Sequence, residues 1–356
     1  MAQKFLELME TLDRFIVHRA WEVEGLVYGL LTGYPTMWIG PIGIAKTYTI
    51  DILTSLIKDA VLFRYMLTKF TEPEELFGAY DIRMLKKGRI IRVTKGKLPE
   101  ADIVYLDEPF KASSAIRNAL LDIILYRRFY NGERYIETKT KAMYMSANEV
   151  PVLTEDLAFI DRSAVRIFST HLTWDEMEDV LATPTVRGKI SSVGYVLTIS
   201  DIEEAQREVD EIERVIAGSS ELRKLIVSLA KASSENAEKS GEKMEISERR
   251  LNMVRRVAAV AAYIYDEEPN ADHVAIATAY ALPSSWSTYV ATLTAINQLL
   301  PDSSIAYINK IRTVKTEIKN AASEADKVSL SSKLAELIRN APKRHFLKKE
   351  VEKTKV

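Results

Sequence analysis

The most specific chemical signal in this sequence is a glycine-containing turn between a predicted strand, Thr36–Ile39, and a helix predicted over residues 48–58. Glycines let backbone N–H groups close around phosphate oxygens, and the start of a helix adds positive potential there. A lysine and a threonine at the end of such a turn are typical of a P-loop: the lysine contacts the β- and γ-phosphates and the threonine hydroxyl binds Mg²⁺. The residues predicted to hold the nucleotide are Gly40, Pro41, Ile42, Gly43, Ile44, Ala45, Lys46 and Thr47.

One position of this turn departs from the usual P-loop pattern. Ala45 stands directly before Lys46, where a glycine is usual. The alternative interpretation is a chance glycine turn before a helix. We favour the P-loop because the strand, the Lys46-Thr47 pair and the helix all occur together.

A second signal is the apolar run 103–106, which is followed directly by Asp107 and Glu108. In parallel α/β folds, ligands bind at the carboxyl ends of the strands, so a strand ending here would bring both acids to the phosphates. We expect Asp107 to hold Mg²⁺ through water and Glu108 to orient or deprotonate the attacking water. The alternative is a strand that ends in solvated acids, and the P-loop upstream weighs against it.

Three further candidates lie at the ends of predicted elements. Asn148 follows an apolar strand and offers an amide that can position the lytic water, although it could also lie in an ordinary turn. Arg162 lies just before a strand, where it could reach a neighbouring subunit's nucleotide and stabilise the transferring phosphoryl group, or form a surface salt bridge with Asp161. Arg249 begins a long helix and could fold over the phosphates, or lie on a solvated face.

The order of elements predicts an α/β fold. Up to about residue 170 short apolar runs alternate with helical stretches, which indicates a mostly parallel sheet with helices on its faces. After about residue 190 we expect no strands, only helices, including one over Glu248–Tyr265 that Ser247 caps. Residues 231–246 are predicted to be a polar loop, and 342–356 a frayed basic tail. The predicted strands are residues 36–39, 61–66, 103–106, 142–146 and 164–168.

The bulk composition is that of an ordinary globular protein. Of 356 residues, 47% are hydrophobic and 28% charged, and the formal net charge of −1 does not indicate a polyanion binder. The absence of cysteine excludes disulfides, thiolate zinc sites and a cysteine nucleophile, and it fits either a reducing compartment or heat tolerance. We recognise no signal peptide and no apolar run long enough to span a membrane, so we expect a cytoplasmic protein.

The segment 83–97 is a local exception to this balance, because it carries seven basic residues and no acidic one. Two glycines bracket residues 89–95, where aliphatic and basic residues alternate, so a β-hairpin is predicted. We expect this segment to be the surface that binds the target of the protein, which would be an acidic protein segment or nucleic acid. The alternative is a solvated loop that keeps the protein soluble. The basic residues are Arg83, Lys86, Lys87, Arg89, Arg92, Lys95 and Lys97.

Taken in this order, the motifs resemble those of the MoxR family of AAA+ ATPases. Within that family they are most similar to the RavA branch, whose members pair with von Willebrand A-domain proteins. Residues 63–78, 98–101 and 128–132 are similar to that branch as well, and the resemblance covers roughly residues 1–280. Family members tolerate alanine before the P-loop lysine. Beyond residue 280 the sequence departs from RavA, because it has no strand-rich insert there, so the known partner of RavA is not transferred.

The resemblance implies ATP and Mg²⁺ as cofactors, with Asn148 as the sensor 1 residue and Arg249 as the sensor 2 residue. It implies that Arg162 is the arginine finger, with Arg166 as the alternative. The implied domains are an AAA+ P-loop core over residues 1–190, an α-helical lid over 191–280 and a helical extension with a basic tail over 281–356. It also places the basic segment in an insert that faces the central pore of the ring or the partner.

Three functions remain open at this point. The first is a homo-hexameric motor that remodels or matures a partner protein, with a von Willebrand A-domain protein as a candidate partner. The second is a nucleic-acid motor, such as a viral or restriction-type translocase. The third is a nucleotide-gated scaffold, which the intact Lys46, Asp107 and Glu108 argue against because a scaffold has no need of a water-activating glutamate.

Overall fold

The computed structural model describes residues 1–132, 134–150, 159–183, 194–321 and 323–352. The chain divides into two compact units, Met1–Asp210 and Glu211–Val356. The division into three domains remains a prediction. No helix among the described residues is long and apolar enough to cross a membrane.

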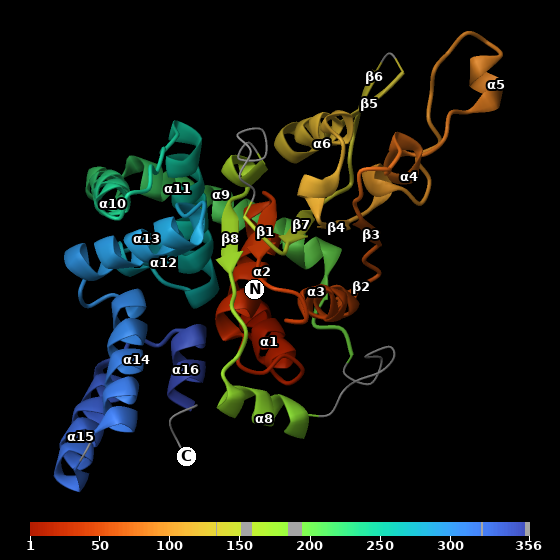
Figure 1. Ribbon diagram of the computed structural model, residues 1–356. Coiled ribbons are helices and arrows are strands. Elements are labelled where there is room, and N and C mark those ends of the chain that lie inside the picture. Colours follow the sequence, from red (N-terminus) through yellow and green to blue (C-terminus); the bar gives the residue numbers. More distant parts are fainter. Residues whose placement is uncertain (133, 151–158, 184–193, 322, 353–356) are drawn as a thin grey trace. The chain divides into compact units, whose positions relative to one another are not determined.

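The first unit is built on a five-stranded parallel sheet with the strand order β3-β4-β7-β1-β8 (Figure 1). These strands confirm the five predicted from the sequence. All residues of β1, β7 and β8 are buried, which agrees with their nearly continuous apolar runs, because a parallel sheet is covered on both faces. The strands are β1 (Thr36–Ile39), β3 (Leu62–Met66), β4 (Ile103–Asp107), β7 (Ala142–Ala147) and β8 (Val165–Phe168).

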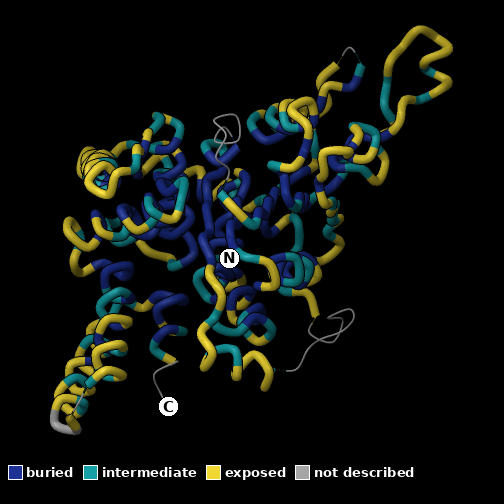
Figure 2. The backbone as a smooth tube through the Cα atoms, viewed as in Figure 1, coloured by how far each residue is buried: buried dark blue, intermediate teal, exposed yellow. Residues whose placement is uncertain are grey.

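Helices of the same unit cover this sheet. The most buried of them, α2 (Ala20–Thr32), packs on β7 and β8, and α1 (Ala2–Asp13) packs on α2. The remaining helices include α3 (Lys46–Ser55), α6 (Ser114–Tyr126) and α8 (Trp174–Ala182). Figure 2 shows the resulting core as a buried zone along the sheet and α2.

Two smaller sheets were not predicted from the sequence. Strand β2 (Ile57–Lys58) occupies the end of the predicted helix 48–58 and pairs in parallel with β9 (Leu197–Thr198). The expectation that strands stop after about residue 190 is therefore wrong by one short strand. An antiparallel hairpin joins β5 (Arg128–Asn131) to β6 (Arg134–Glu137). Strands β2 and β9 have two residues each, which is too short for a periodic pattern. Strand β6 is exposed throughout and β5 at alternate residues, so neither has the continuous apolar run of β1 and β8.

The basic segment is not the predicted β-hairpin. It follows α4 (Pro73–Phe77), contains the single turn α5 (Ile82–Leu85) and returns through one isolated bridge between Tyr80 and Arg92. Figure 1 shows α5 at the tip of this projection, beyond α4 and away from the sheet. The N-cap Asp81 explains the helical turn, because its carboxylate accepts the backbone N–H groups of Arg83 and Met84.

The second unit is helical throughout its described residues, as predicted. Helix α11 (Glu248–Tyr265) begins where expected, and the Ser247 hydroxyl accepts the backbone N–H of Arg250. Helix α9 (Ile199–Gly218) runs across the boundary between the units. The others are α10 (Ser220–Lys239), α12 (Ala271–Ala281), α13 (Trp286–Leu299), α14 (Ser304–Asn320), α15 (Glu324–Asn340) and α16 (His345–Glu352).

Two predictions for the second unit are wrong. Residues 231–239 continue α10 instead of forming a loop, because Ser233 and Ala237 give it a buried face of small residues that a search for large apolar residues misses. Residues 345–352 form α16 instead of a frayed tail. This helix is fixed by the buried Phe346 and by Arg344, which donates to Glu267 at 2.7 and 2.9 Å and to Asp272 at 2.9 Å.

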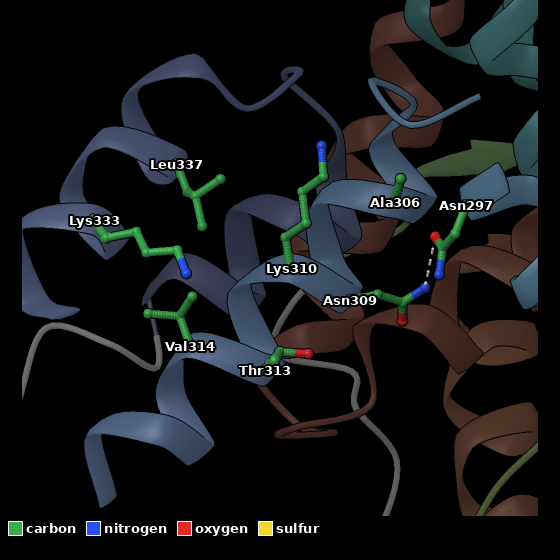
Figure 3. A pocket seen from close by; sticks show the side chains of 8 residues that line it. All are labelled: Asn297, Ala306, Asn309, Lys310, Thr313, Val314, Lys333 and Leu337. Atoms are coloured by element: carbon green, nitrogen blue, oxygen red, sulfur yellow. Dashed lines mark hydrogen bonds between the residues drawn. The ribbon is translucent and has the colours of Figure 1, made fainter. Parts of the chain in front are cut away.

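A cavity of about 350 Å³ lies among α13, α14 and α15 (Figure 3). Both lysines that line it already have partners. Lys310 donates to Pro301 O at 2.5 Å, and Lys333 Nζ lies 3.8 Å from a carboxylate oxygen of Glu317. Asn309 donates to Asn297 at 3.2 Å across one side. None of the residues predicted to bind nucleotide lines this cavity, so it is separate from the candidate site.

Candidate nucleotide-binding site

The candidate site lies at the carboxyl edge of the sheet, where β1, β4 and β7 end side by side. The register pairs Ile39 with Ala147 and Asp107 with Ser146. The backbone N–H of Gly40 donates to Ala147 O at 3.1 Å and that of Glu108 donates to Ser146 O at 2.8 Å. Three segments that are far apart in the sequence are thereby fixed against one another at the edge where α/β folds bind phosphate.

The turn between β1 and α3 has a left-handed residue at the position where the P-loop pattern usually has glycine. Ala45, the N-cap of α3, has φ of 65°, in the left-handed region that favours glycine. This explains why a glycine is usual at this position and shows that the alanine adopts the same conformation. Gly40 is required for a different reason, because a Cβ there would lie 2.9 Å from Ser169 O. Helix α3 begins at Lys46, two residues before the predicted start, and ends at Ser55 instead of residue 58.

The ammonium group of Lys46 lies inside this turn. Its Nζ donates to Gly40 O, to Pro41 O at 3.2 Å and to Asn148 Oδ1 at 3.0 Å. Burial lowers the pKa of Lys46, while the nearby carboxylates of Asp107 and Glu108 act in the opposite direction. The lysine is thus a desolvated cation facing two acids, and a phosphate would provide further negative charge for it.

Asn148 connects the P-loop to the acidic end of β4. Its Oδ1 accepts from Lys46, and its Nδ2 donates to Glu108 Oε1. Glu108 is buried, has φ of 55° and lies 3.6 Å from Lys111 Nζ. Lys46, Asn148 and Glu108, predicted separately from three motifs, therefore form one hydrogen-bonded group.

A second group joins the two predicted magnesium ligands, Thr47 and Asp107. The Thr47 hydroxyl lies 3.1 Å from the Tyr105 hydroxyl, which lies 2.8 Å from Ser146 Oγ, and Ser146 donates to Asp107 Oδ1. Sequence reasoning missed Tyr105 and Ser146. For Tyr105 the available signal was its spacing, because it precedes Asp107 by two residues and so shares its face of β4.

These residues fit a magnesium ion that is bound mainly by nucleotide. Mg²⁺ usually takes one or two carboxylates together with substrate phosphates and water. Thr47 and Asp107 supply a hydroxyl and a carboxylate, and no group of three or more acidic or histidine side chains suited to a metal occurs among the described residues. The site residues therefore suit a metal that arrives with a phosphate-bearing ligand.

The structure does not bring the predicted arginines to this edge. Arg162 lies in the helical residues 159–162 before β8, at the amino end of a strand that runs parallel to β1. It is thus at the opposite edge of the sheet from the P-loop of its own chain. Arg166 is 0% exposed and donates to Ile160 O at 2.9 Å.

Arg249 belongs to the second unit, where it lies in the first turn of α11. Its neighbour Arg250 is buried and donates to Glu245 O at 3.0 Å and to Leu282 O at 3.1 Å. Arg250 therefore has a structural role within the helical unit, and Arg249 is the more exposed residue of the pair. Its assignment as sensor 2 stays a prediction.

The fold is similar to that of a solved structure, a "putative ATPase" from Cytophaga hutchinsonii. The match has a TM-score of 0.64 at 19% identity and covers 80% of this chain and 87% of that one. It confirms the predicted α/β sheet followed by a helical region.

Three curated relatives each match part of the chain. A structural protein of Acidianus two-tailed virus is 31% identical over 231 residues, which cover 62% of this chain and 37% of the viral protein. Two uncharacterized proteins of Methanocaldococcus jannaschii are 38% and 37% identical over 161 and 164 residues, which cover 45% and 46% of this chain and 43% of each relative. The chain thus matches less than half the length of these relatives.

A family model places the first unit more specifically. The MoxR domain of the MoxR-vWA-beta-propeller ternary systems matches residues 3–206, which is more than half of the chain. This range includes every residue of the candidate site at the carboxyl edge of the sheet. The chain belongs to the MoxR family.

Proposed function

We propose that this protein binds ATP with Mg²⁺ and hydrolyses it to remodel or mature a partner protein. The observation that carries this proposal is the convergence of Lys46, Asn148 and Glu108 in one hydrogen-bonded group at the carboxyl edge of the sheet. A lysine to bind phosphate, an amide to position water and a carboxylate to accept its proton are the groups that phosphoryl transfer to water needs.

Each residue has a role that follows from its place. The backbone of residues 40–45 and the start of α3 surround the phosphates, and Lys46 exchanges its contacts with loop carbonyls for phosphate oxygens. Thr47 and Asp107 hold the Mg²⁺, which neutralises charge on the phosphates. Glu108 accepts the proton of the attacking water, and Asn148 orients both the water and Glu108.

We assign the arginine finger to Arg162, acting on the nucleotide of a neighbouring copy. Its position at the far edge of the sheet rules out contact with the P-loop of its own chain, since β1 alone spans roughly 13 Å. Arg166 is unsuited to this role because its guanidinium is buried and bonded within its own unit. A finger supplied in trans requires an assembly, and a homo-hexameric ring of the RavA-like type is the form we propose.

The partner contacts the basic segment and is an acidic protein with apolar side chains. Ile82 and Ile90 are 68% and 60% exposed beside the basic side chains, and Leu85 is exposed as well. Aliphatic side chains favour a protein ligand, because nucleic acid offers charge and ring faces instead. The family model, drawn from systems that include a vWA protein, supports a von Willebrand A-domain partner.

Nucleic acid is the second candidate ligand, and the exposed Arg83, Lys86, Lys87 and Arg89 favour it. The two can be separated with a labelled peptide that mixes glutamate and leucine and a single-stranded oligonucleotide of equal charge. We expect the peptide to bind more tightly and to depend less on salt, since binding to nucleic acid weakens steeply as counterions are released. Tighter binding of the oligonucleotide would support the nucleic-acid motor.

ATP binding is tested with Lys46→Ala. We expect calorimetry to show a loss of ATP affinity of about 100-fold or more, because the charge-assisted contacts to phosphate are lost. The control is Lys58→Ala, which removes an exposed lysine on β2, beyond the end of α3. Equal affinities for the wild type and Lys46→Ala would end the P-loop interpretation.

The trans role of Arg162 is tested by mixing subunits. Arg162→Ala and Lys46→Ala proteins are each expected to be inactive, and mixed rings should recover part of the hydrolysis because one interface then has both residues intact. Absence of recovery in rings shown to exchange subunits would argue against a site shared between copies. Recovery with Arg166→Ala but not with Arg162→Ala would reverse the assignment.

A further inference from the structure

A chain of hydroxyl groups connects the two predicted magnesium ligands beneath the site. It runs from Thr47 on α3 to Tyr105 on β4 at 3.1 Å, then to Ser146 on β7 at 2.8 Å, and ends at Asp107 Oδ1. The two central members are closed off from water, since Tyr105 is 1% exposed and Ser146 0% exposed. Their hydroxyl groups must therefore satisfy one another within the protein.

The donor of each hydrogen bond in this chain of hydroxyls can be assigned by starting from the carboxylate of Asp107. A carboxylate accepts hydrogen bonds and has no proton to donate, so Ser146 donates to Asp107. A hydroxyl has one proton, so Ser146 can only accept from Tyr105. Tyr105 has then used its own proton, and Thr47 must donate to it.

We propose that Tyr105 is a positioning residue that prepares Thr47 to bind Mg²⁺. The Thr47 proton is directed toward Tyr105, so the lone pairs of Thr47 Oγ1 are left to face a cation. A hydroxyl whose proton pointed into the site would instead repel the metal. Through Ser146, the same chain fixes one oxygen of Asp107, so both ligands are oriented before the metal arrives.

This inference rests on the proposed function, because the Mg²⁺ in question accompanies ATP. Its test is Tyr105→Phe, which keeps the buried ring and removes only the hydroxyl. ATP affinity is measured by calorimetry with Mg²⁺ and with excess EDTA. We expect the affinity in EDTA to be unchanged. The gain in affinity caused by Mg²⁺ should fall about tenfold, as is common when a hydrogen-bond partner of a metal ligand is removed.

Tyr144→Phe is the matched control. Tyr144 is also buried, on the neighbouring strand β7, and its hydroxyl donates to Leu26 O at 2.9 Å outside the chain of hydroxyls. It should lower thermal stability without changing the gain from Mg²⁺. If both tyrosine variants lose the same part of this gain, Tyr105 acts through general stability and the proposal is wrong.

Ser146→Ala breaks the same chain at its next link and provides a second, independent variant. Both single variants should lose a similar part of the gain from Mg²⁺, and the double variant should lose no more than either one, because one break interrupts the whole chain. Additive losses would overturn the proposal, and so would an undiminished gain in folded Tyr105→Phe. If the wild type fails to bind ATP at all, the proposed function itself fails, which is a distinguishable result.

Discussion

The carboxyl edge of the sheet and the projecting basic segment both use basic side chains, which are buried in the first and exposed in the second. At the sheet edge Lys46 is buried among carbonyls, an amide and two nearby acids, so its charge is prepared for one ligand in one geometry. On the projection Lys86, Lys87 and Arg89 are exposed and suited to a variable surface. Local burial, more than residue type, therefore distinguishes a chemical site from a recognition surface.

Arg92 shows that this contrast holds even within the basic segment. Its guanidinium donates to Glu74 at 3.1 Å, to Gly78 O at 2.9 Å and to the Tyr80 hydroxyl at 2.8 Å. Its backbone N–H donates to Asn131 Oδ1 at 2.7 Å, and Asn131 Nδ2 donates back to Arg92 O at 3.1 Å. Arg92 thus anchors the projection to the β5–β6 hairpin, while the basic residues beyond it form the surface.

The largest effect is expected at the enclosed site, from Glu108→Gln. The amide keeps the shape of the side chain but cannot take a proton from water, so kcat should fall by about 100-fold or more. ATP affinity should stay near that of the wild type, and steady-state hydrolysis with calorimetry separates the two quantities. Hydrolysis at the wild-type rate would show that another residue activates the water.

A second effect is expected from reversing the tip, with Lys86→Glu, Lys87→Glu and Arg89→Glu combined. ATP binding should be unchanged, because the P-loop is built from other segments, while binding of the glutamate–leucine peptide should fall by about tenfold or more through charge repulsion. The control reverses three exposed lysines of α10, Lys224, Lys231 and Lys239, with the same change in net charge. Equal losses of peptide affinity in both triple variants would show that the effect comes from the net charge of the protein and not from the tip.

A smaller effect is expected from Arg92→Lys, which keeps the charge and removes the planar fork of donors. Peptide binding should weaken less than in the reversed tip, because the surface charges remain and only the anchor is loosened. Hydrogen exchange should become faster at the backbone N–H groups of Asp81 and Val93, which bond across the stem. Unchanged exchange there would mean that Arg92 is not the anchor.

The smallest effect is expected from Ala45→Gly in the P-loop. A residue other than glycine in the left-handed region costs about 1–2 kcal/mol, which the greater flexibility of an unfolded glycine partly offsets by about 0.5–1 kcal/mol. The variant should therefore be slightly more stable to heat, with ATP affinity close to that of the wild type. A clear loss of stability would show that the Ala45 methyl group contributes packing that outweighs the backbone strain.

The chemistry of the enclosed site could be predicted from sequence because it resides in contiguous motifs. A strand, a turn with Lys46-Thr47 and a helix form one local unit, and Asp107 and Glu108 directly follow their own strand. Parallel strands then carry these ends to a common edge, which is a rule of the fold class and needs no knowledge of individual contacts. The five strands and the helical second unit followed from the same local periodicity.

Which polar residues act together across segments depends on the packing of the folded chain. Tyr105 and Ser146 look like ordinary members of two buried strands until the register of β4 and β7 brings their hydroxyls within 2.8 Å. Similarly, Arg92 was predicted as part of the basic surface and Arg166 as an alternative arginine finger, yet both form internal contacts in the structure. A sequence fixes the periodicity and local conformation of each element, whereas the partners of a polar side chain depend on contacts between segments distant along the chain.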